Sequence, residues 1–180
     1  MKGNRVSTGI QIDMGEFCIR HFSPDDVAGI VYHADNPKVA RYLRNQFPHP
    51  YTTEDAKTWI LHALGQTPVR DFALAGGAGV IGGIGLVFQD DVYFQSAELG
   101  YWLGEPYWGR GIMTRAVGAF TRYAFDAYDL VRLFAHVFES NPASARVLEK
   151  AGYRLEGVLE KNVNKNGRIL NEWLYACIKV

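Results

Sequence analysis

The sequence predicts a mixed α/β fold, in which helices flank a mostly antiparallel sheet with a central parallel strand pair. Three observations support this prediction. Strand-like segments meet at a Gly76-Gly77 turn and at an Asn166-Gly167 turn, both typical of antiparallel hairpins. Between the two turns, a long helical pattern over residues 112–128 separates two further strand-like segments. A strand, a helix and a strand in succession are typical of a parallel pair.

Length and composition indicate a single domain. A chain of 180 residues with 48% hydrophobic residues can close one sizeable core, and no linker-like stretch divides it. We expect one domain over residues 1–180, with a core over about 17–180 and a loosely ordered or edge segment over 1–12. Cys18 and Cys177 lack the paired spacing of a metal site and are expected to be buried free thiols.

Charge, hydropathy and histidine spacing argue against several classes of partner. Lys and Arg together number 19, as do Asp and Glu, so no net field draws the protein to nucleic acid or to an anionic membrane. No apolar run approaches the ~18 residues that cross a bilayer, and residues 1–12 lack the apolar core of a signal peptide. His33, His49 and His62 have no partner at i, i+4, so no metal site is predicted. We expect a cytoplasmic protein.

In the first part of the chain, capping residues mark the helix starts. A first strand is expected over residues 17–21. Ser23 followed by proline predicts a helix start, and Asn36 followed by proline predicts a second, short helix. Thr52 is followed three residues later by aspartate, the spacing of a capping box, so a third helix should run toward Gly65.

The middle of the chain predicts an antiparallel meander. Strand-like segments over residues 71–75, 80–88 and 97–103 follow one another through short turns, the first of which is Gly76-Gly77. Neighbouring strands in such a series pair antiparallel.

The last part should contain the crossover and a hairpin. Apolar residues at helical spacing predict an amphipathic helix over 112–128, and a buried strand follows over 130–138. If no other strand lies between them, the strands before and after this helix are parallel neighbours. Asn141 and Gly152 have the positions of caps at the two ends of a further helix. The closing strands are expected over residues 153–159 and 170–178.

A glycine-rich loop precedes the long helix. Gly109 and Gly111 stand where free backbone N–H groups and the helix dipole favour an anion such as a pyrophosphate. Glycines before a helix are also common in plain turns, so this signal alone leaves both interpretations open. No lysine completes a nucleotide-triphosphate loop, which excludes that class. A dinucleotide fingerprint would need a third glycine at Thr114, but Glu139 could act as its ribose-binding acid, so this alternative stays open.

Four motifs follow one another in a characteristic order and spacing. They are Ala97-Glu98-Leu99-Gly100-Tyr101-Trp102-Leu103, the glycine loop, Asn141-Pro142-Ala143-Ser144 and Glu149-Lys150-Ala151-Gly152-Tyr153. This set resembles the GNAT superfamily of N-acetyltransferases, specifically its RimJ/RimL branch of ribosomal-protein N-terminal acetyltransferases. The motifs cover residues 97–153, and the flanking elements are compatible from residue 17 to the end. The resemblance implies the GNAT fold, an N-acetyltransferase activity and acetyl-CoA as the acyl donor, with CoA as product.

The resemblance also implies which residues bind the cofactor, because the glycine loop of the family binds the acyl-CoA pyrophosphate through backbone amides. The expected cofactor-binding residues are Tyr101, Trp102, Leu103, Trp108, Gly109, Arg110, Gly111, Ile112, Met113, Thr114, Asn141 and Ser144. Three positions depart from the family pattern. Trp108 replaces a Gln or Arg, Met113 replaces a small residue, and Leu148 replaces a tyrosine that donates a proton to the leaving thiolate in many members.

Attack of an amine on a thioester needs a base, a donor for the oxyanion and a proton for the departing sulfur. Glu98 is the candidate base, directly or through a water, because it shares a strand face with Gly100 and Gly104, which should leave room for a ligand. Ser144, in the first turn of its helix, is the candidate acid. A backbone N–H near the end of the strand should meet the oxyanion if the strand splays from its neighbour, as it does in the family.

Each of these candidates also has a plain structural interpretation, which the sequence leaves open. Glu98 could be a salt-bridged strand carboxylate, Ser144 an ordinary first-turn serine, and Asn141 only a helix cap. His136 is a lone histidine in an apolar strand, which is more typical of a core residue, and it is left out of the predicted site.

The acceptor is expected to be an amine, either a peptide N-terminus or a small molecule. By analogy of fold, it should enter between the loop over residues 45–51 and the hairpin over 161–168. Lys161, Lys165 and Arg168 of the hairpin would suit an acidic peptide or a carboxylate-bearing amine, although such clusters are usually solvated turns. The protein is expected to be a monomer or homodimer. Two other functions stay open, a non-catalytic acyl-CoA-binding module and a dinucleotide-dependent oxidoreductase.

Overall fold

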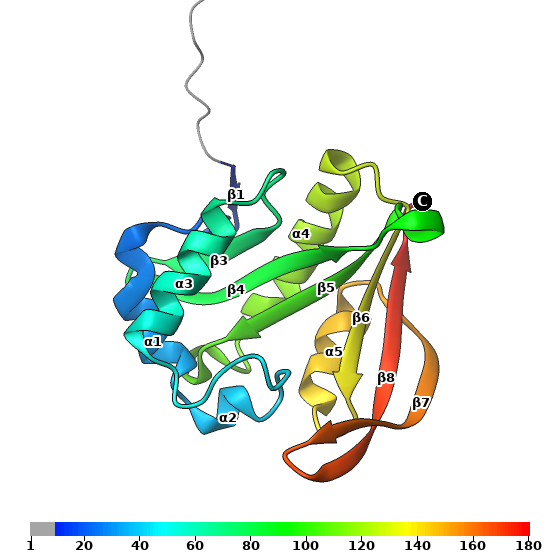
Figure 1. The fold of residues 1–180 in the computed structure, drawn as a ribbon. Coiled ribbons are helices and arrows are strands. Elements are labelled where there is room, and N and C mark those ends of the chain that lie inside the picture. Colours follow the sequence, from blue (N-terminus) through cyan, green and yellow to red (C-terminus); the bar gives the residue numbers. More distant parts are fainter. Residues whose placement is uncertain (1–9) are drawn as a thin grey trace, which may run out of the picture.

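A mixed sheet of eight strands runs through residues 10–180, the part of the chain that the structure, a computed structural model, describes (Figure 1). The strands are β1 (Gln11–Asp13), β2 (Phe17–Arg20), β3 (Asp71–Gly76), β4 (Gly79–Phe88), β5 (Ser96–Leu103), β6 (Arg132–Phe138), β7 (Arg154–Lys165) and β8 (Arg168–Ile178). Their order in the sheet is β1-β2-β3-β4-β5-β6-β8-β7. Only β5 and β6 are parallel, which confirms the predicted mixed sheet with its central parallel pair.

Helices cover both faces of the sheet. They are α1 (Val27–Ala34), α2 (Pro37–Ala40), α3 (Thr53–Leu64), α4 (Ile112–Ala127) and α5 (Pro142–Lys150). Successive strand residues point to opposite faces, and β3 shows the result: Phe72 and Leu74 pack in the core with α4 and α5, whereas Ala73 packs in the core with α1 and α3. None of the helices within residues 10–180 is long and apolar enough to cross a membrane.

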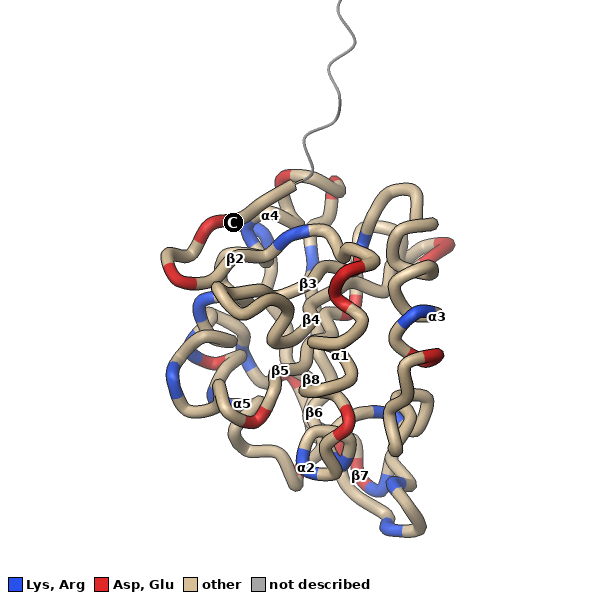
Figure 2. Tube along the Cα trace, turned by 90° about the vertical axis from the view of Figure 1, so that its left-hand side faces the viewer, with Lys and Arg blue, Asp and Glu red and all other residues tan. Residues whose placement is uncertain are grey.

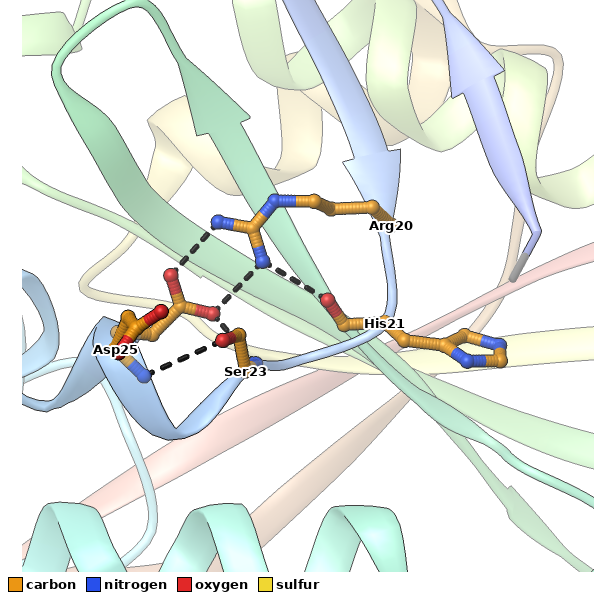
Figure 3. Close-up of polar contacts among 5 residues, drawn as sticks. Arg20, His21, Ser23 and Asp25 are labelled. Carbon is orange, nitrogen blue, oxygen red and sulfur yellow. Dashed lines mark hydrogen bonds and ion pairs between the residues drawn. The ribbon is translucent and has the colours of Figure 1, made fainter. Parts of the chain in front are cut away.

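The turn from β2 into α1 is fixed by side-chain hydrogen bonds (Figure 3). A short 3₁₀ helix, η1 (Pro24–Asp26), begins at Ser23, whose hydroxyl accepts a hydrogen bond from the backbone N–H of Asp25 at 3.2 Å. The Asp26 carboxylate is buried and accepts two hydrogen bonds from the Arg20 guanidinium, each 2.7 Å long. The cap predicted at Ser23 is therefore confirmed, and so are those at Asn36 and Thr52.

The structure differs from the expectations in three places. β1 was not predicted; it takes up residues 11–13 at the edge of the sheet, while residues 1–9 of the expected N-terminal segment lie outside the described part. β7 continues well past the predicted end at residue 159, through two irregularities in its ladder with β8. Cys18 and Cys177 are free, as expected, but half-buried rather than buried. The Asn166-Gly167 turn is confirmed, since both residues have the positive φ of a tight hairpin, 51° and 81°.

Candidate active site

The central feature of the site is a split in the sheet between β5 and β6. Their parallel ladder holds for three residue pairs, from Ser96 with Arg132 to Glu98 with Phe134. β5 then continues to Leu103 along β4, and β6 continues along β8, without further pairing to each other. The strands therefore separate beyond Glu98, and the splay on which the predicted oxyanion donor depends is present.

A cavity of about 1290 Å³ opens in this split. Part of its wall comes from the separated parts of β5 and β6, from the glycine loop with the start of α4, and from the start of α5. The loop between α2 and α3, the helix α3 and the strand β4 also contribute. Predicted site residues in the wall are Glu98, Tyr101, Trp102, Leu103, Trp108, Gly109, Gly111, Ile112, Met113, Thr114, Asn141 and Ser144. Arg110 is the exception, because its guanidinium lies over the rings of Phe17 and Tyr107, 5.8 and 5.7 Å from their centroids.

The glycine loop leaves the start of α4 without a side-chain cap. Gly109 and Gly111 have φ values of 73° and 71°, in the left-handed region that glycine adopts without strain. Gly111 is the residue that precedes α4, and no side chain accepts from the first-turn N–H groups there. Trp108 donates from Nε1 to the carbonyl of Leu103 at 2.7 Å, which ties the loop to the end of β5. Uncapped amides and the helix dipole together favour an anion at this position.

The side chain of Met113, which departs from the small residue of the family, packs mainly into the protein interior. It is 6% exposed and belongs to the main hydrophobic core. Leu148, where a tyrosine stands in many members of the family, is fully buried in the same core. Any hydroxyl that serves the leaving sulfur must therefore come from another residue.

Glu98 faces the cavity and is held by an arginine. Its carboxylate forms an ion pair with Arg44, from the loop between α2 and α3. Glu98 is 16% exposed and Arg44 54%, and the hydrogen bond that Arg44 donates to Glu98 raises the pKa of the Arg44 guanidinium. The space expected beside Glu98 exists at Gly100, where a Cβ would meet nothing within 4 Å. It does not exist at Gly104, where a Cβ would lie 2.6 Å from His33 Nδ1, so that expectation was wrong.

His136 also lines the cavity, although the sequence analysis left it out as a core residue. Its side chain is 23% exposed, and Nδ1 lies 3.1 Å from Oε2 of buried Glu172. That carboxylate also accepts a hydrogen bond from Nδ2 of Asn162 at 2.7 Å. Phe134 is in register with Glu98, and His136 is two residues further along β6, so His136 and Glu98 face the same side of the sheet. This side carries a second candidate base.

Ser144 lies on the opposite face of the sheet from Glu98. Its hydroxyl lies 2.7 Å from the phenol oxygen of Tyr101, and its backbone N–H donates to the side chain of Asn141 at 3.2 Å. Tyr101 was expected in the site as a cofactor-binding residue, and the contact between its phenol and Ser144 is an addition to that expectation. Burial raises the pKa of the Tyr101 phenol, and the hydrogen bond with Ser144 lowers it by a smaller amount. The phenol is therefore protonated at neutral pH and can donate a hydrogen bond. If the phenol donates to Ser144 Oγ, the serine proton is free to point into the cavity.

The fold and the split sheet define the class of protein, and comparison with known proteins names the family. Residues 16–154 match the acetyltransferase (GNAT) domain, and the chain belongs to this family. It is 48% identical over 73 residues to a protein of Bacillus subtilis named probable N-acetyltransferase YjcK. It is 33% identical over 84 residues to the ribosomal-protein-serine acetyltransferase of Escherichia coli. The two matches cover 41% and 47% of this chain, and 40% and 47% of the respective relatives. The chain therefore matches less than half of the length of each relative.

A solved structure extends the similarity to nearly the whole fold. The ribosomal L7/L12 α-N-protein acetyltransferase RimL, in complex with coenzyme A, superposes with a TM-score of 0.83 over 94% of this chain and 98% of its own, at 19% identity. The dinucleotide alternative is wrong, because that fold needs a doubly wound parallel sheet and this one is mostly antiparallel. Glu139, its expected ribose-binding acid, instead accepts a hydrogen bond from the backbone N–H of Asn171 at 2.9 Å.

Proposed function

We propose that this protein is an N-acetyltransferase that transfers the acetyl group of acetyl-CoA to a primary amine, on a peptide N-terminus or on a small molecule. The observation that carries the proposal is the split between β5 and β6 beside the uncapped start of α4. An extended chain ending in a thioester could lie along the free edge of β5 while its pyrophosphate meets the amides of α4. Family membership and the CoA complex of RimL support this choice of donor.

The proposed binding of acetyl-CoA divides among three groups of residues. Backbone N–H groups from Gly109 to Thr114 hold the pyrophosphate, and Asn141 at the start of α5 can meet the arm of the cofactor. The free backbone near Trp102 and Leu103 offers an N–H group to the carbonyl oxygen of the thioester, where negative charge develops. These donors are backbone groups, so the substitutions at Trp108 and Met113 leave them in place.

The proposed chemistry uses groups from both faces of the sheet. Glu98 accepts a proton from the amine through a water, so that the nitrogen lone pair can attack the thioester carbon. A C–N bond forms and the C–S bond breaks. Ser144 donates its hydroxyl proton to the departing sulfur and takes the phenol proton of Tyr101 through their hydrogen bond. The proton held by Glu98 returns to Tyr101 through solvent once the products leave.

Calorimetric titration of CoA and acetyl-CoA into the purified protein tests the donor, with a nicotinamide dinucleotide as control. We expect saturable binding of both thiol cofactors and no heat from the dinucleotide. Release of free CoA from acetyl-CoA is then followed with a panel of peptide and small-molecule amines. Absence of CoA binding would refute the proposal as a whole. Tight CoA binding without thiol release across the panel would instead favour a non-catalytic acyl-CoA-binding module.

A further inference from the structure

A second, smaller cavity lies between α2 and the tip of the β7–β8 hairpin. Its volume is about 310 Å³, and its lining residues are Arg41, Tyr42, Ser140, Lys165, Asn166, Arg168 and Leu170. Three of these side chains are cationic and none is acidic. Figure 1 shows the tip of the hairpin turning back toward α2, and in Figure 2 Lys and Arg positions lie along this part of the molecule.

The cations of this cavity have no acidic partner. Arg41 stacks on the ring of Tyr42, 4.5 Å from its centroid, and donates to the Tyr42 hydroxyl at 2.7 Å. Lys165 donates to Oδ1 of Asn45 at 3.0 Å, and burial lowers its pKa. Within residues 10–180, neither of them nor Arg168 forms an ion pair. Three cations gathered without a counter-charge repel one another, and a bound anion would relieve that repulsion.

The basic cavity adjoins the active-site cavity. Tyr42 lines both, and Arg44, two residues further along the same loop, pairs with Glu98. Ser140 lines the basic cavity and its neighbour Asn141 lines the active-site cavity. An acceptor whose amine reaches Glu98 can therefore extend the rest of its chain toward Arg41 and the hairpin.

We propose that this basic cavity binds a carboxylate of the acceptor, so that the preferred substrates are amines that also carry a carboxylate. Guanidinium groups suit this role because their planar N–H donors match the two oxygens of a carboxylate. The carboxylate could belong to an acidic residue close to a peptide N-terminus or to a small amino acid. The inference rests on the proposed function, since it assigns the acceptor of that same site.

The test is equilibrium binding of matched acceptors to the CoA-saturated protein and, in parallel, to the free protein. The peptide pair is Ser-Asp-Glu-Ala and Ser-Asn-Gln-Ala, each amidated at its C-terminus, and the small-molecule pair is glutamate and glutamic acid diamide, which has no carboxylate. We expect an acidic member to bind on the order of tenfold more tightly than its amide partner, with the difference shrinking at high salt. A preference in the peptide pair identifies a peptide acceptor, and a preference in the amino-acid pair alone identifies a small one.

The Arg41→Gln, Arg168→Gln double variant should remove the preference and leave binding of the amide partner unchanged. The control is Arg122→Gln, an exposed arginine of α4 that lines neither cavity, and it should keep the preference. Equal binding of acidic and amide partners by the unaltered protein, or a preference that survives in the double variant, would overturn the inference. These titrations measure binding, so their result does not depend on turnover. Failure to release thiol with any amine would refute the proposed function, and the titrations would still decide whether the cavity binds a carboxylate.

Discussion

Glu98 and His136 face the same side of the sheet at the split, and single substitutions can tell which of them acts as the base. We expect Glu98→Gln to lower kcat by about 100-fold, at the lower end of what general-base catalysis contributes. His136→Gln should change kcat far less, because the carboxylate of Glu98 remains to accept the proton. The measurement is steady-state thiol release at saturating acetyl-CoA.

Loss of the Arg44–Glu98 ion pair has to be separated from loss of the base. Arg44→Gln breaks the same pair and keeps the carboxylate, so it is the matched control and should retain most of the activity. If Arg44→Gln were as damaging as Glu98→Gln, Glu98 would be a structural partner of the arginine. A large loss confined to His136→Gln would move the role of base to the histidine.

The pair formed by Tyr101 and Ser144 should act as a unit on the leaving sulfur. Tyr101→Phe removes the hydroxyl that lies 2.7 Å from Ser144 Oγ, and we expect both it and Ser144→Ala to lower kcat by roughly tenfold with little change in the KM of acetyl-CoA. The double variant should be no worse than Ser144→Ala, because residues of one hydrogen-bonded network are not additive. Strictly additive losses would mean that the two hydroxyls act separately.

Part of the site could be predicted at the scale of single residues, and part could not. Glu98, Ser144 and the glycine loop belong to motifs that are contiguous in sequence, and the structure brings them to one cavity. His136 and Arg44 reach that cavity only through the parallel register of β5 with β6 and the path of the loop after α2. No local pattern specifies either. Tyr101 was predicted in the site, but its hydrogen bond with Ser144 was not, since the two residues lie 43 positions apart in the chain.

At the scale of elements, most of the fold was predicted from turn and capping residues. Ser23, Asn36, Thr52 and Asn141 each cap the helix that was expected to follow, because a short polar side chain satisfies first-turn N–H groups that otherwise lack partners. The irregular part of β7 was not predicted. Lys161 has a φ of 52° there, and such ladder irregularities follow from pairing with β8 rather than from an apolar pattern.

Gly111, which precedes α4, and Gly118, which lies inside it, provide a matched test of the anion site. Gly111 precedes the helix with a φ of 71°, so Gly111→Ala should destabilise the protein by roughly 1–2 kcal/mol and weaken CoA binding, because the strained residue shifts the first-turn amides. Gly118 lies inside the helix, where a Cβ would come no closer than 3.9 Å to Arg122, and Gly118→Ala should stabilise by about 0.4–1 kcal/mol. Urea unfolding and CoA titration of both variants check this.

Gly118→Ala should leave CoA affinity unchanged, because the substitution is distant from the start of the helix. Equal CoA affinity in Gly111→Ala and the unaltered protein would show that the amides of the loop do not hold the cofactor.

At the scale of the whole molecule, the split divides the sheet into two parts that share only three residue pairs, with β1 to β5 on one side and β6, β8 and β7 on the other. The same division creates the free strand edge that a thioester arm can use. A ligand in the split would therefore contact both parts of the sheet, and its binding should increase the free energy of unfolding. At a hundredfold excess over its Kd, CoA should raise the free energy of unfolding by about 2.7 kcal/mol.

Hydrogen exchange should locate this effect. With CoA bound, amides of residues 99–103 and of the first turn of α4 should exchange more slowly, because they lose contact with water or gain a partner in the ligand. Amides of β2 and β3, on the far side of β4 from the split, should change less. The measurement is exchange followed by mass spectrometry of peptides from each strand, with and without CoA. Protection confined to the surface of α3, or the same small change in every peptide, would contradict binding in the split, because only a ligand between β5 and β6 protects the edge of β5 selectively.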